Sequence, residues 1–203
     1  MEREDPSAFF DELWSTGDYW GLETSVYDQR RFEAQLALVD DRRYRRTLEY
    51  GCGGGEFTRR LATISHSVLA LDASALAVAR AKPRVPENVE LQVVDAVEFD
   101  PVDAGPFDLV VICETIYYLG WLRTFFEIGW FAHRLLEAVE PEGRLLLGNT
   151  IIDDEKSLES PWLIDTYRDL FANAGFELQV EERFRGPKGG VELEALLSRF
   201  KRT

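Results

Sequence analysis

Short apolar runs alternate with stretches of helical hydrophobic spacing along most of this chain. Runs such as 68–71 and 109–113 have the length of buried strands, and polar residues follow them. In the segment 30–40, the apolar residues Phe32, Leu36 and Val39 recur at helical spacing instead. Strands that alternate with helices predict a parallel sheet, so we expect one α/β domain with helices on both faces of the sheet.

The predicted elements follow one another without repeats or low-complexity segments. Pro141 and Gly143 mark a turn before the fifth strand, and Gly175 marks the end of a helix. The predicted helices span 6–18, 30–40, 57–64, 75–81, 124–139 and 162–174. The predicted strands span 48–50, 68–72, 89–96, 107–113, 143–149, 176–184 and 191–198. The last two strands are expected to pair antiparallel across a flexible loop at 185–190.

The first strand leads into a glycine-rich turn, in which Glu49, Gly51, Gly53 and Gly55 alternate with other residues. Glycine is needed where the chain takes positive φ or where a ligand approaches the backbone, and such strand–turn–helix loops bind adenosine-containing cofactors. A dinucleotide-binding loop has Gly or Ala at the sixth position from Gly51, but this chain has Glu56 there. The charge of Glu56 would repel a pyrophosphate, which disfavours NAD and FAD.

Carboxylates end the next two predicted strands. Asp72 lies about 20 residues after the glycine loop, where Rossmann-like folds place the acid that accepts the ribose hydroxyls. The alternative role is an N-cap of the following helix, and the two roles are compatible. Asp95 follows the third strand and is either a ligand-binding acid or a residue of a surface turn.

Together these motifs resemble those of the class I S-adenosylmethionine (SAM) dependent methyltransferases. The resemblance implies SAM as the cofactor, a Rossmann-like seven-stranded sheet of order 3-2-1-4-5-7-6, and adenine recognition by Asp95 with the following backbone amide. The residues that it places at the cofactor are Trp20, Tyr27, Glu49, Gly51, Cys52, Gly53, Gly55, Phe57, Asp72, Ala73, Asp95, Ala96, Val97, Glu114 and Thr115.

Two further segments resemble the nodulation protein S type of small methyltransferase, and this likeness extends over roughly residues 18–200. The segment 20–32 combines Trp20, Ser25 and Tyr27 ahead of a helix, and the segment 107–119 joins a strand to Glu114 and Tyr118. The resemblance implies N-methylation of an amino sugar or a related amine. Many methyltransferases have a His in the place of Tyr118, so a His base is not available there in this chain.

Methyl transfer from a sulfonium is an in-line displacement, which requires positioning and exclusion of water rather than a covalent nucleophile. An amine must first lose a proton, and we expect Glu114 to accept it while Tyr118 hydrogen-bonds the amine. The alternative roles of Glu114 are to bind the amino group of SAM or to cap the next helix. Aromatic faces attract a sulfonium. The aromatic candidates are Tyr19, Trp20, Tyr27, Tyr117 and Tyr118, with Tyr117 and Trp121 expected beside the acceptor.

Charge and composition limit the partners. The formal charge is −14, and a phosphate backbone is bound chiefly by clustered Lys and Arg, so nucleic acid is not expected as a partner. The Asn/Asp-Pro-Pro-Tyr type of tetrapeptide found in many base-modifying methyltransferases is also absent. The basic run 42–46, placed before the first strand, is more typical of a solvated face that balances acids. Cys52 and Cys113, with two His elsewhere, lack metal-ligand spacing, so we expect reduced cysteines and no metal.

The remaining expectations concern location and function. No apolar run approaches the roughly 20 residues that span a bilayer, and the charged N-terminus lacks the apolar part of a secretion signal. We therefore expect a cytoplasmic monomer or homodimer without a membrane partner, in which residues 1–44 form a helical lid over a core of 45–203. The expected function is SAM-dependent methylation of a small polar acceptor, with an amine as the expected acceptor. The alternatives are a small-molecule O-methyltransferase and a SAM-binding regulatory homologue without catalysis.

Overall fold

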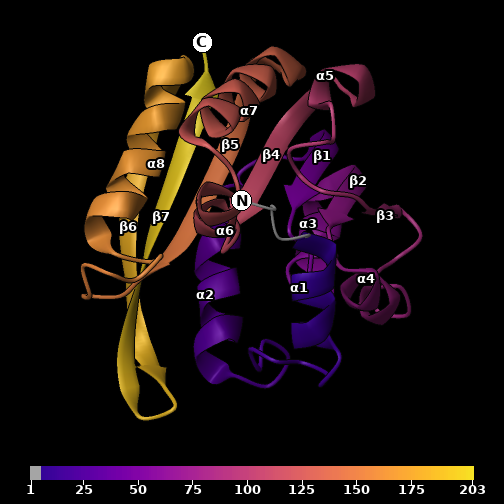
Figure 1. Cartoon of the computed structure of the whole chain (residues 1–203). Helices are drawn as coiled ribbons and strands as arrows, with labels where there is room; N and C mark the ends of the chain where they lie inside the picture. The colour runs from indigo at the N-terminus through magenta and orange to yellow at the C-terminus, as the bar shows by residue number, and fades with distance from the viewer. Residues whose placement is uncertain (1–5) are drawn as a thin grey trace.

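The computed structural model describes residues 6–203, which fold around one seven-stranded sheet. Its strand order, β3-β2-β1-β4-β5-β7-β6 (Figure 1), confirms the predicted order. The first five strands are parallel, and β7 runs antiparallel to both β5 and β6. The strands are β1 (Tyr44–Tyr50), β2 (Ser65–Asp72), β3 (Val89–Val93), β4 (Phe107–Cys113), β5 (Val139–Ile151), β6 (Phe176–Lys188) and β7 (Val191–Arg202).

Helices cover both faces of the sheet and connect its parallel strands (Figure 1). They are α1 (Pro6–Trp14), α2 (Val26–Ala37), α3 (Thr58–Ile64), α4 (Ala75–Ala81), α5 (Pro101–Ala104), α6 (Ile116–Leu122), α7 (Phe125–Ala138) and α8 (Pro161–Ala174). Thr124 and Glu127 form a reciprocal capping box at the start of α7. Within residues 6–203, no helix combines the length and the apolar composition needed to cross a bilayer.

The central strands are buried on both faces because their apolar side chains alternate between two cores. Val110 and Ile112 of β4 pack with α7 and α8, whereas Leu109 and Val111 pack with α2 and α3. This is the two-residue period of a strand covered by helices on both sides. The sheet is therefore the middle of three layers.

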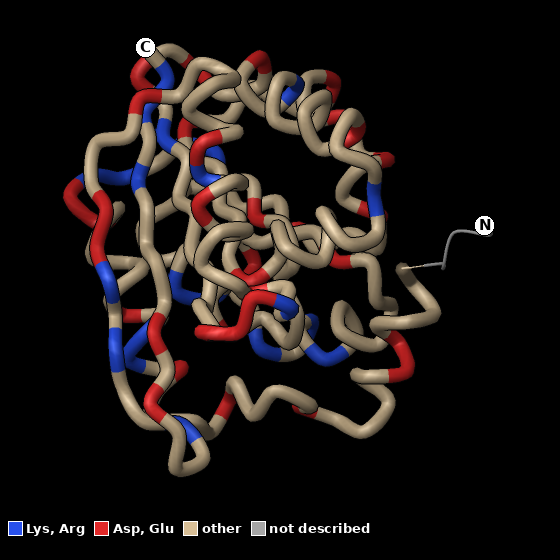
Figure 2. The backbone as a smooth tube through the Cα atoms, turned by 60° about the vertical axis from the view of Figure 1, so that its left-hand side comes forward, with Lys and Arg blue, Asp and Glu red and all other residues tan. Residues whose placement is uncertain are grey.

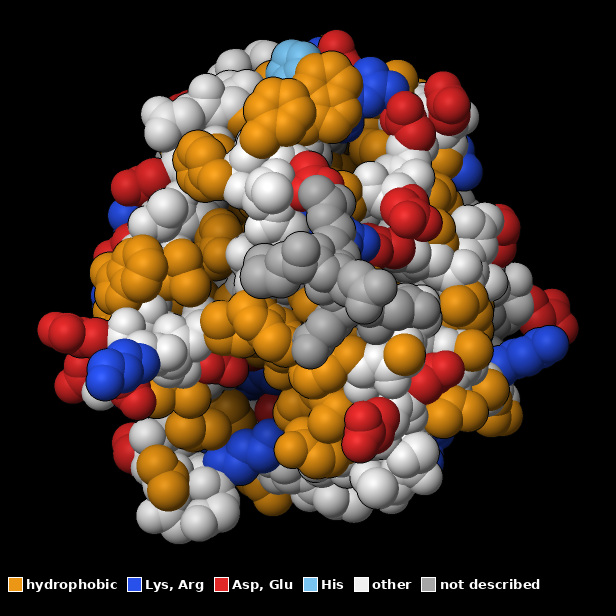
Figure 3. Space-filling model, viewed as in Figure 1, with side chains coloured by type: hydrophobic (Ala, Val, Ile, Leu, Met, Phe, Trp, Pro, Cys, Tyr) orange, Lys and Arg blue, Asp and Glu red, His pale blue; other side chains and the backbone are white. Residues whose placement is uncertain are grey.

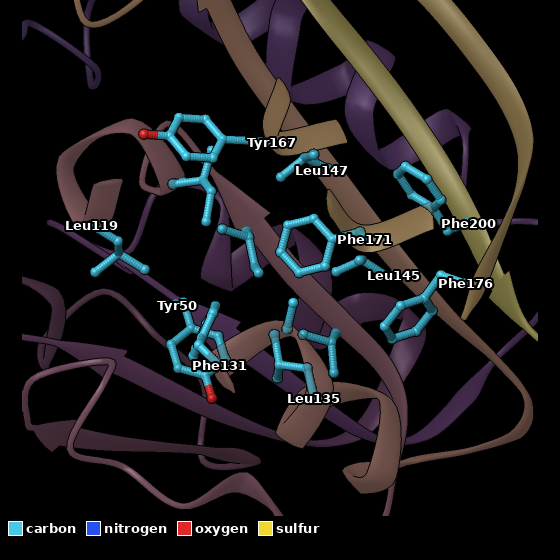
Figure 4. Close-up of a cluster of buried hydrophobic side chains, with 14 of the residues drawn as sticks. Tyr50, Leu119, Phe131, Leu135, Leu145, Leu147, Tyr167, Phe171, Phe176 and Phe200 are labelled. Carbon is cyan, nitrogen blue, oxygen red and sulfur yellow. The ribbon is translucent and has the colours of Figure 1, made fainter. Parts of the chain in front are cut away.

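The larger core lies between the sheet and α7 and α8 (Figure 4). Phe131 and Leu135 of α7 and Phe171 of α8 point toward Leu145 and Leu147 of β5. All five side chains are buried, and each contributes about 1.5–3 kcal/mol through removal of apolar surface from water. This packing makes the sheet a rigid platform for the loops at its carboxyl edge.

The structure differs from the sequence prediction in several segments. The first strand begins at Tyr44, so part of the basic run 42–46 lies inside β1, where Asp108 accepts hydrogen bonds from the backbone N–H groups of Arg45 and Arg46. The predicted loop 185–190 belongs largely to β6, which reaches Lys188 because it pairs with β7 as far as Val191. Helices α5 and α6 were not among the predicted elements.

Figure 2 shows acidic and basic positions interspersed along the chain.

The segment 6–31, here called the leader, lies across the carboxyl edge of the sheet. Asp11 of α1 accepts hydrogen bonds from Ser74 Oγ and from Leu76 N at the start of α4. Glu23 forms ion pairs with Arg80 and Arg84. The leader is therefore tied to the α4 side of the molecule by polar contacts, while the rings of Phe9 and Phe10 contact Trp121 and Tyr118 of α6.

Candidate functional site

The carboxyl ends of β1, β2 and β4 open into a cavity of about 330 Å³, which the leader partly covers. The described residues that line it come from the leader, the glycine loop, the β4–α6 segment, the end of β5 and the β6–β7 hairpin. Figure 3 shows that hydrophobic side chains form several patches on the face of the molecule that is viewed in Figure 1. The sequence-predicted site residues that line the cavity are Trp20, Tyr27, Glu49, Gly51, Cys52, Gly53, Phe57, Asp72, Ala73, Asp95, Ala96, Glu114, Thr115, Tyr117 and Tyr118.

The glycine loop has no room for side chains. Gly51 has φ of 75°, and a Cβ added there would lie 2.2 Å from Thr115 Oγ1. Gly53 has φ of 51°, and a Cβ there would lie 3.0 Å from the indole of Trp14. Gly55 also has positive φ, but it packs against Ala81 of α4 and does not line the cavity. The loop therefore presents bare backbone toward the cavity at its first two glycines.

Asp72 lies at the end of β2 and faces the glycine loop. Its carboxylate accepts hydrogen bonds from Gly53 N at 2.8 Å and from Ser74 N at 2.9 Å. The N-cap of α4 is Ser74 rather than Asp72. Burial raises the pKa of Asp72 to about 6, against the lowering effect of these backbone donors. Asp72 is thus a restrained acceptor at the cavity wall.

Asp95 lies after β3 and is paired with a residue that the sequence analysis did not single out. It forms an ion pair with Arg123, and Asp95 Oδ1 accepts a hydrogen bond from Val97 N at 2.9 Å. Both side chains of the ion pair are about nine-tenths buried and line the cavity. Val97 itself contributes its backbone to this turn and does not line the cavity.

Glu49 is the most isolated carboxylate of the cavity wall. Its side chain is buried under the glycine loop, and among the described residues its Oε2 atom has no hydrogen-bond partner. Burial raises the pKa of Glu49 to about 7, and the negative charge of Asp72 adds to the rise. An unpartnered buried oxygen next to a cavity is a position that a donor group of a ligand would satisfy.

Glu56 carries less uncompensated charge than the sequence suggests. It accepts a hydrogen bond from Arg59 Nη2 at 2.9 Å and forms a second ion pair with Arg60. Together with Arg84, these partners offset the negative charge of Glu56. That charge is the one expected to repel a pyrophosphate.

Glu114 is held by three donors from three parts of the chain. Arg31 Nη1 lies 2.5 Å from Glu114 Oε1, and Thr150 N donates to the same oxygen at 2.9 Å. Tyr117 Oη donates to Glu114 Oε2 at 2.9 Å. Glu114 also has φ of 56°, which is unusual for a residue other than glycine and aims its side chain from the strand end toward α2.

A chain of alternating charges extends from Glu114 along the cavity wall. Arg31 Nη2 lies 3.0 Å from Asp28 Oδ1, and Lys188 Nζ lies 2.6 Å from Asp28 Oδ2. Arg31 and Asp28 are both buried on α2, whereas Lys188 comes from the end of β6. The four residues thereby connect the leader helix, the end of β4 and the β6–β7 hairpin.

The aromatic candidates divide into two groups. Tyr27 is buried, its ring packs against Phe184 at 5.4 Å, and its hydroxyl has no hydrogen-bond partner among the described residues. Tyr118 also lines the cavity, and its ring contacts Tyr117 at 4.7 Å. Tyr19 and Trp121 are exposed and do not line the cavity.

Sequence reasoning missed several residues of this wall. They are Trp14, Asp28, Arg31, Arg123, Thr150, Glu159 and Lys188. Most come from segments far from the glycine loop. The one local signal is Asp28, the acid that follows Tyr27 in the segment 20–32. Cys52 and Cys113 are free cysteines. Cys52 follows β1 and Cys113 ends β4, and these two strands are neighbours in the sheet. Within the described residues, no group of three or more His, Cys, Asp or Glu is arranged to hold a metal.

The sequence matches a known family over most of its length. The family model of nodulation protein S (NodS) matches residues 8–166. Nodulation protein S of Sinorhizobium fredii is 29% identical over 137 residues, which cover 66% of this chain and 61% of that protein. Nodulation protein S of Bradyrhizobium diazoefficiens is 26% identical over 152 residues, covering 73% of this chain and 70% of that protein. The chain thus spans less than two thirds of the length of the S. fredii relative.

Solved structures share the fold. The N-methyltransferase NodS of Bradyrhizobium japonicum, in complex with S-adenosyl-L-homocysteine (SAH), superimposes with a TM-score of 0.81 at 20% identity. The superposition covers 98% of this chain and 99% of that one. The likeness extends to the leader and the hairpin, since almost the whole chain is covered.

Proposed function

This chain belongs to the nodulation protein S family, and from that premise we propose that it is a SAM-dependent methyltransferase whose acceptor is a small molecule with an amino group. The observation that carries the proposal is the cavity in which the side-chain-free glycine loop, Asp72 and Asp95 converge at the carboxyl edge of a methyltransferase-type sheet. The match to a NodS described as an N-methyltransferase supports the same activity.

The residues of the inner cavity fit an adenosine-containing cofactor with a positive charge. Gly51 and Gly53 leave bare backbone, which a ligand can approach closely. Asp72 would accept hydrogen bonds from the ribose hydroxyls, and Asp95 with Ala96 would meet the adenine edge. The unpartnered Oε2 atom of Glu49 would accept a hydrogen bond from a donor group, either directly or through water.

SAM, when bound, supplies an electrophilic methyl group on a sulfonium. The part played by this chain is to orient the acceptor toward that methyl group and to exclude water. The leader serves the second purpose, because Trp14 and Trp20 cover the cavity beside the glycine loop. Tyr27 and Tyr118 offer aromatic rings to positive charge in the outer part of the cavity.

An amine acceptor is supported by the balance of charge around the cavity. Among the described lining residues, seven are Asp or Glu and three are Arg or Lys. This excess of negative charge attracts a cation and repels an anion, so a protonated amine is favoured over a carboxylate. The family resemblance of the sequence points to amino sugars within this class.

A methyl-transfer screen tests the function. The protein would be incubated with SAM and with glucosamine, ethanolamine or benzylamine, and both SAH release and acceptor mass would be followed by mass spectrometry. We expect methylation of at least one amine. The N-acetylated form of each amine is the matched control and should remain unmodified.

Other outcomes have distinct meanings. Methylation of N-acetylglucosamine would identify an O-methyltransferase, because its amine is blocked. Binding of SAH without turnover of any acceptor would support a regulatory homologue. The absence of both binding and turnover would refute the proposal.

A further inference from the structure

The carboxylates around the cavity differ in what already binds them. Asp28 and Asp95 are paired with Arg or Lys, and Asp72 is bound by two backbone N–H groups. Glu56 is paired with Arg59 and its neighbours. Glu114 also has such donors, so five of the seven carboxylates that line the cavity are bound by cationic side chains or backbone N–H groups.

Three of the roughly four accepting positions of the Glu114 carboxylate are already occupied. Its two oxygens accept hydrogen bonds from Arg31, Tyr117 and the Thr150 backbone. The Arg31 guanidinium is 2% exposed, so its charge is held against Glu114 rather than in solvent. The Arg31 cation already balances the negative charge of Glu114, so this carboxylate attracts an ammonium group less than an unpaired one would.

Glu49 and Glu159 are the two lining carboxylates without such a partner in the described part of the chain. Glu49 lies beneath the glycine loop, in the inner half of the cavity. Glu159 lines the cavity from the loop between β5 and α8, and its side-chain hydrogen bond is with Ser157 Oγ of the same loop. Within residues 6–203, the negative charge of Glu159 therefore lies at the cavity wall without a cation to balance it.

The backbone fixes Glu159 near the groups expected at the acceptor. Ile152 N donates to Glu159 O at 2.9 Å, so the residue is anchored beside the end of β5. Thr150, on the same strand end, binds Glu114. Tyr117 and Tyr118 of α6 face the same space, and the charge of Glu159 adds to the effect of burial that raises the pKa of Tyr118 to about 12.

From this arrangement we propose that Glu159, rather than Glu114, is the carboxylate that binds the ammonium group of the acceptor and accepts its proton. The inference rests on the proposed function. In the step, the N–H bond breaks, the proton passes to a Glu159 oxygen, and the electron pair stays on nitrogen for attack on the methyl group. Tyr118 lies beside the ammonium and offers its ring to the positive charge before the proton is lost.

Steady-state kinetics of Glu159→Gln test this role. With the amine that the wild-type protein methylates best among glucosamine, ethanolamine and benzylamine, we expect kcat/KM to fall by about 10² or more, as for loss of a general base. The affinity for SAH, measured by calorimetry, should stay within about twofold, because the groups that we assign to the cofactor are the glycine loop, Asp72 and Asp95 rather than Glu159. The deficit in kcat/KM should shrink as the pH approaches the pKa of the free amine, since solvent then removes the proton instead. A merely structural role would not produce this pH dependence.

The matched control is Glu155→Gln, in the same loop but exposed and outside the cavity lining. It should retain wild-type kinetics. An active wild-type protein together with an equally active Glu159→Gln variant would overturn the assignment of Glu159 and leave the proposed function intact. A deficit that is constant with pH would also overturn it. A wild-type protein that methylates none of the amines would refute the proposed function, and the assignment with it.

Discussion

Arg31 and Glu114 form an ion pair that joins the leader helix α2 to the carboxyl end of β4, with Arg31 Nη1 2.5 Å from Glu114 Oε1. The guanidinium is buried, whereas the carboxylate keeps 23% of its side chain exposed to the cavity. Because Arg31 also binds Asp28, one buried cation holds two acids in place. The pair thus sets both the position of the leader and the charge of the cavity wall.

The first prediction concerns this pair. Glu114→Gln keeps the shape but removes one of the charges that balance the buried guanidinium, so we expect a loss of about 3 kcal/mol in the free energy of unfolding. Urea denaturation would measure it. Arg31→Met combined with Glu114→Gln should cost less than the sum of the two single variants, and strict additivity would contradict the coupling. A Glu114→Gln variant of normal stability, with turnover lowered by about 10²–10⁴, would instead make Glu114 the base.

The second prediction concerns the leader. Among residues 6–27, only Trp14 and Tyr27 are buried apolar residues, and only the partly buried Leu22 packs against a sheet core. Deletion of all residues before Asp28 should therefore leave the sheet folded, as seen by circular dichroism, while methyl transfer is lost. The physical reason is that Trp14 and Trp20 no longer cover the cavity. Full turnover by the truncated protein would show that the leader is not a lid.

The third prediction is a pH dependence of stability that arises from Glu49. Its pKa is raised from 4.5 to about 7, so the folded state binds more protons than the unfolded state between these values. The free energy of unfolding should therefore fall as the pH rises through this window, by about 3 kcal/mol at most from this group. Glu49→Gln should flatten that part of the curve, measured by urea denaturation at several pH values. The exposed Glu87→Gln should not, and an unchanged slope in Glu49→Gln would disprove the assignment.

The fourth prediction separates the ring of Tyr27 from its hydroxyl. If the ring faces the sulfonium, Tyr27→Leu should weaken SAM binding by about 0.5–2 kcal/mol but leave the binding of SAH, which has no positive sulfur, nearly unchanged. Tyr27→Phe keeps the ring and should preserve the SAM-to-SAH affinity ratio. It should also raise stability by about 1 kcal/mol, because it removes a buried hydroxyl that has no hydrogen-bond partner within residues 6–203. Equal losses for both ligands in Tyr27→Leu would argue for a packing role against Phe184.

The sequence was sufficient for the sheet because local patterns determine it. The apolar residues of β4 alternate between two cores, which is the signature of a strand covered on both faces. Positive φ at Gly51 and Gly53 explains why glycine marks the turn after β1. Asp72, at the end of β2, and Asp95, shortly after β3, lie at the same edge of the sheet, and both line the cavity as the strand pattern predicts.

The rest of the site depends on contacts between distant segments. Lys188 was assigned to a flexible loop because glycine and proline surround it, but pairing with β7 carries β6 as far as Lys188 and brings its side chain to Asp28. Arg31 lies on a helix whose apolar residues have ordinary helical spacing. Nothing in the neighbouring sequence indicates that Arg31 pairs with Glu114. Glu159 lies in an acidic loop that is distinguished only by its place beside the cavity.

Calorimetric titration with SAH tests the central claim most directly, namely that the cavity over the glycine loop is a SAM site. The account predicts micromolar affinity for the wild-type protein. It predicts a loss of more than about tenfold in Asp72→Ala, since each charge-assisted hydrogen bond to a ribose hydroxyl contributes about 1.5–3 kcal/mol. No binding by the wild-type protein, or unchanged affinity in Asp72→Ala, would contradict it.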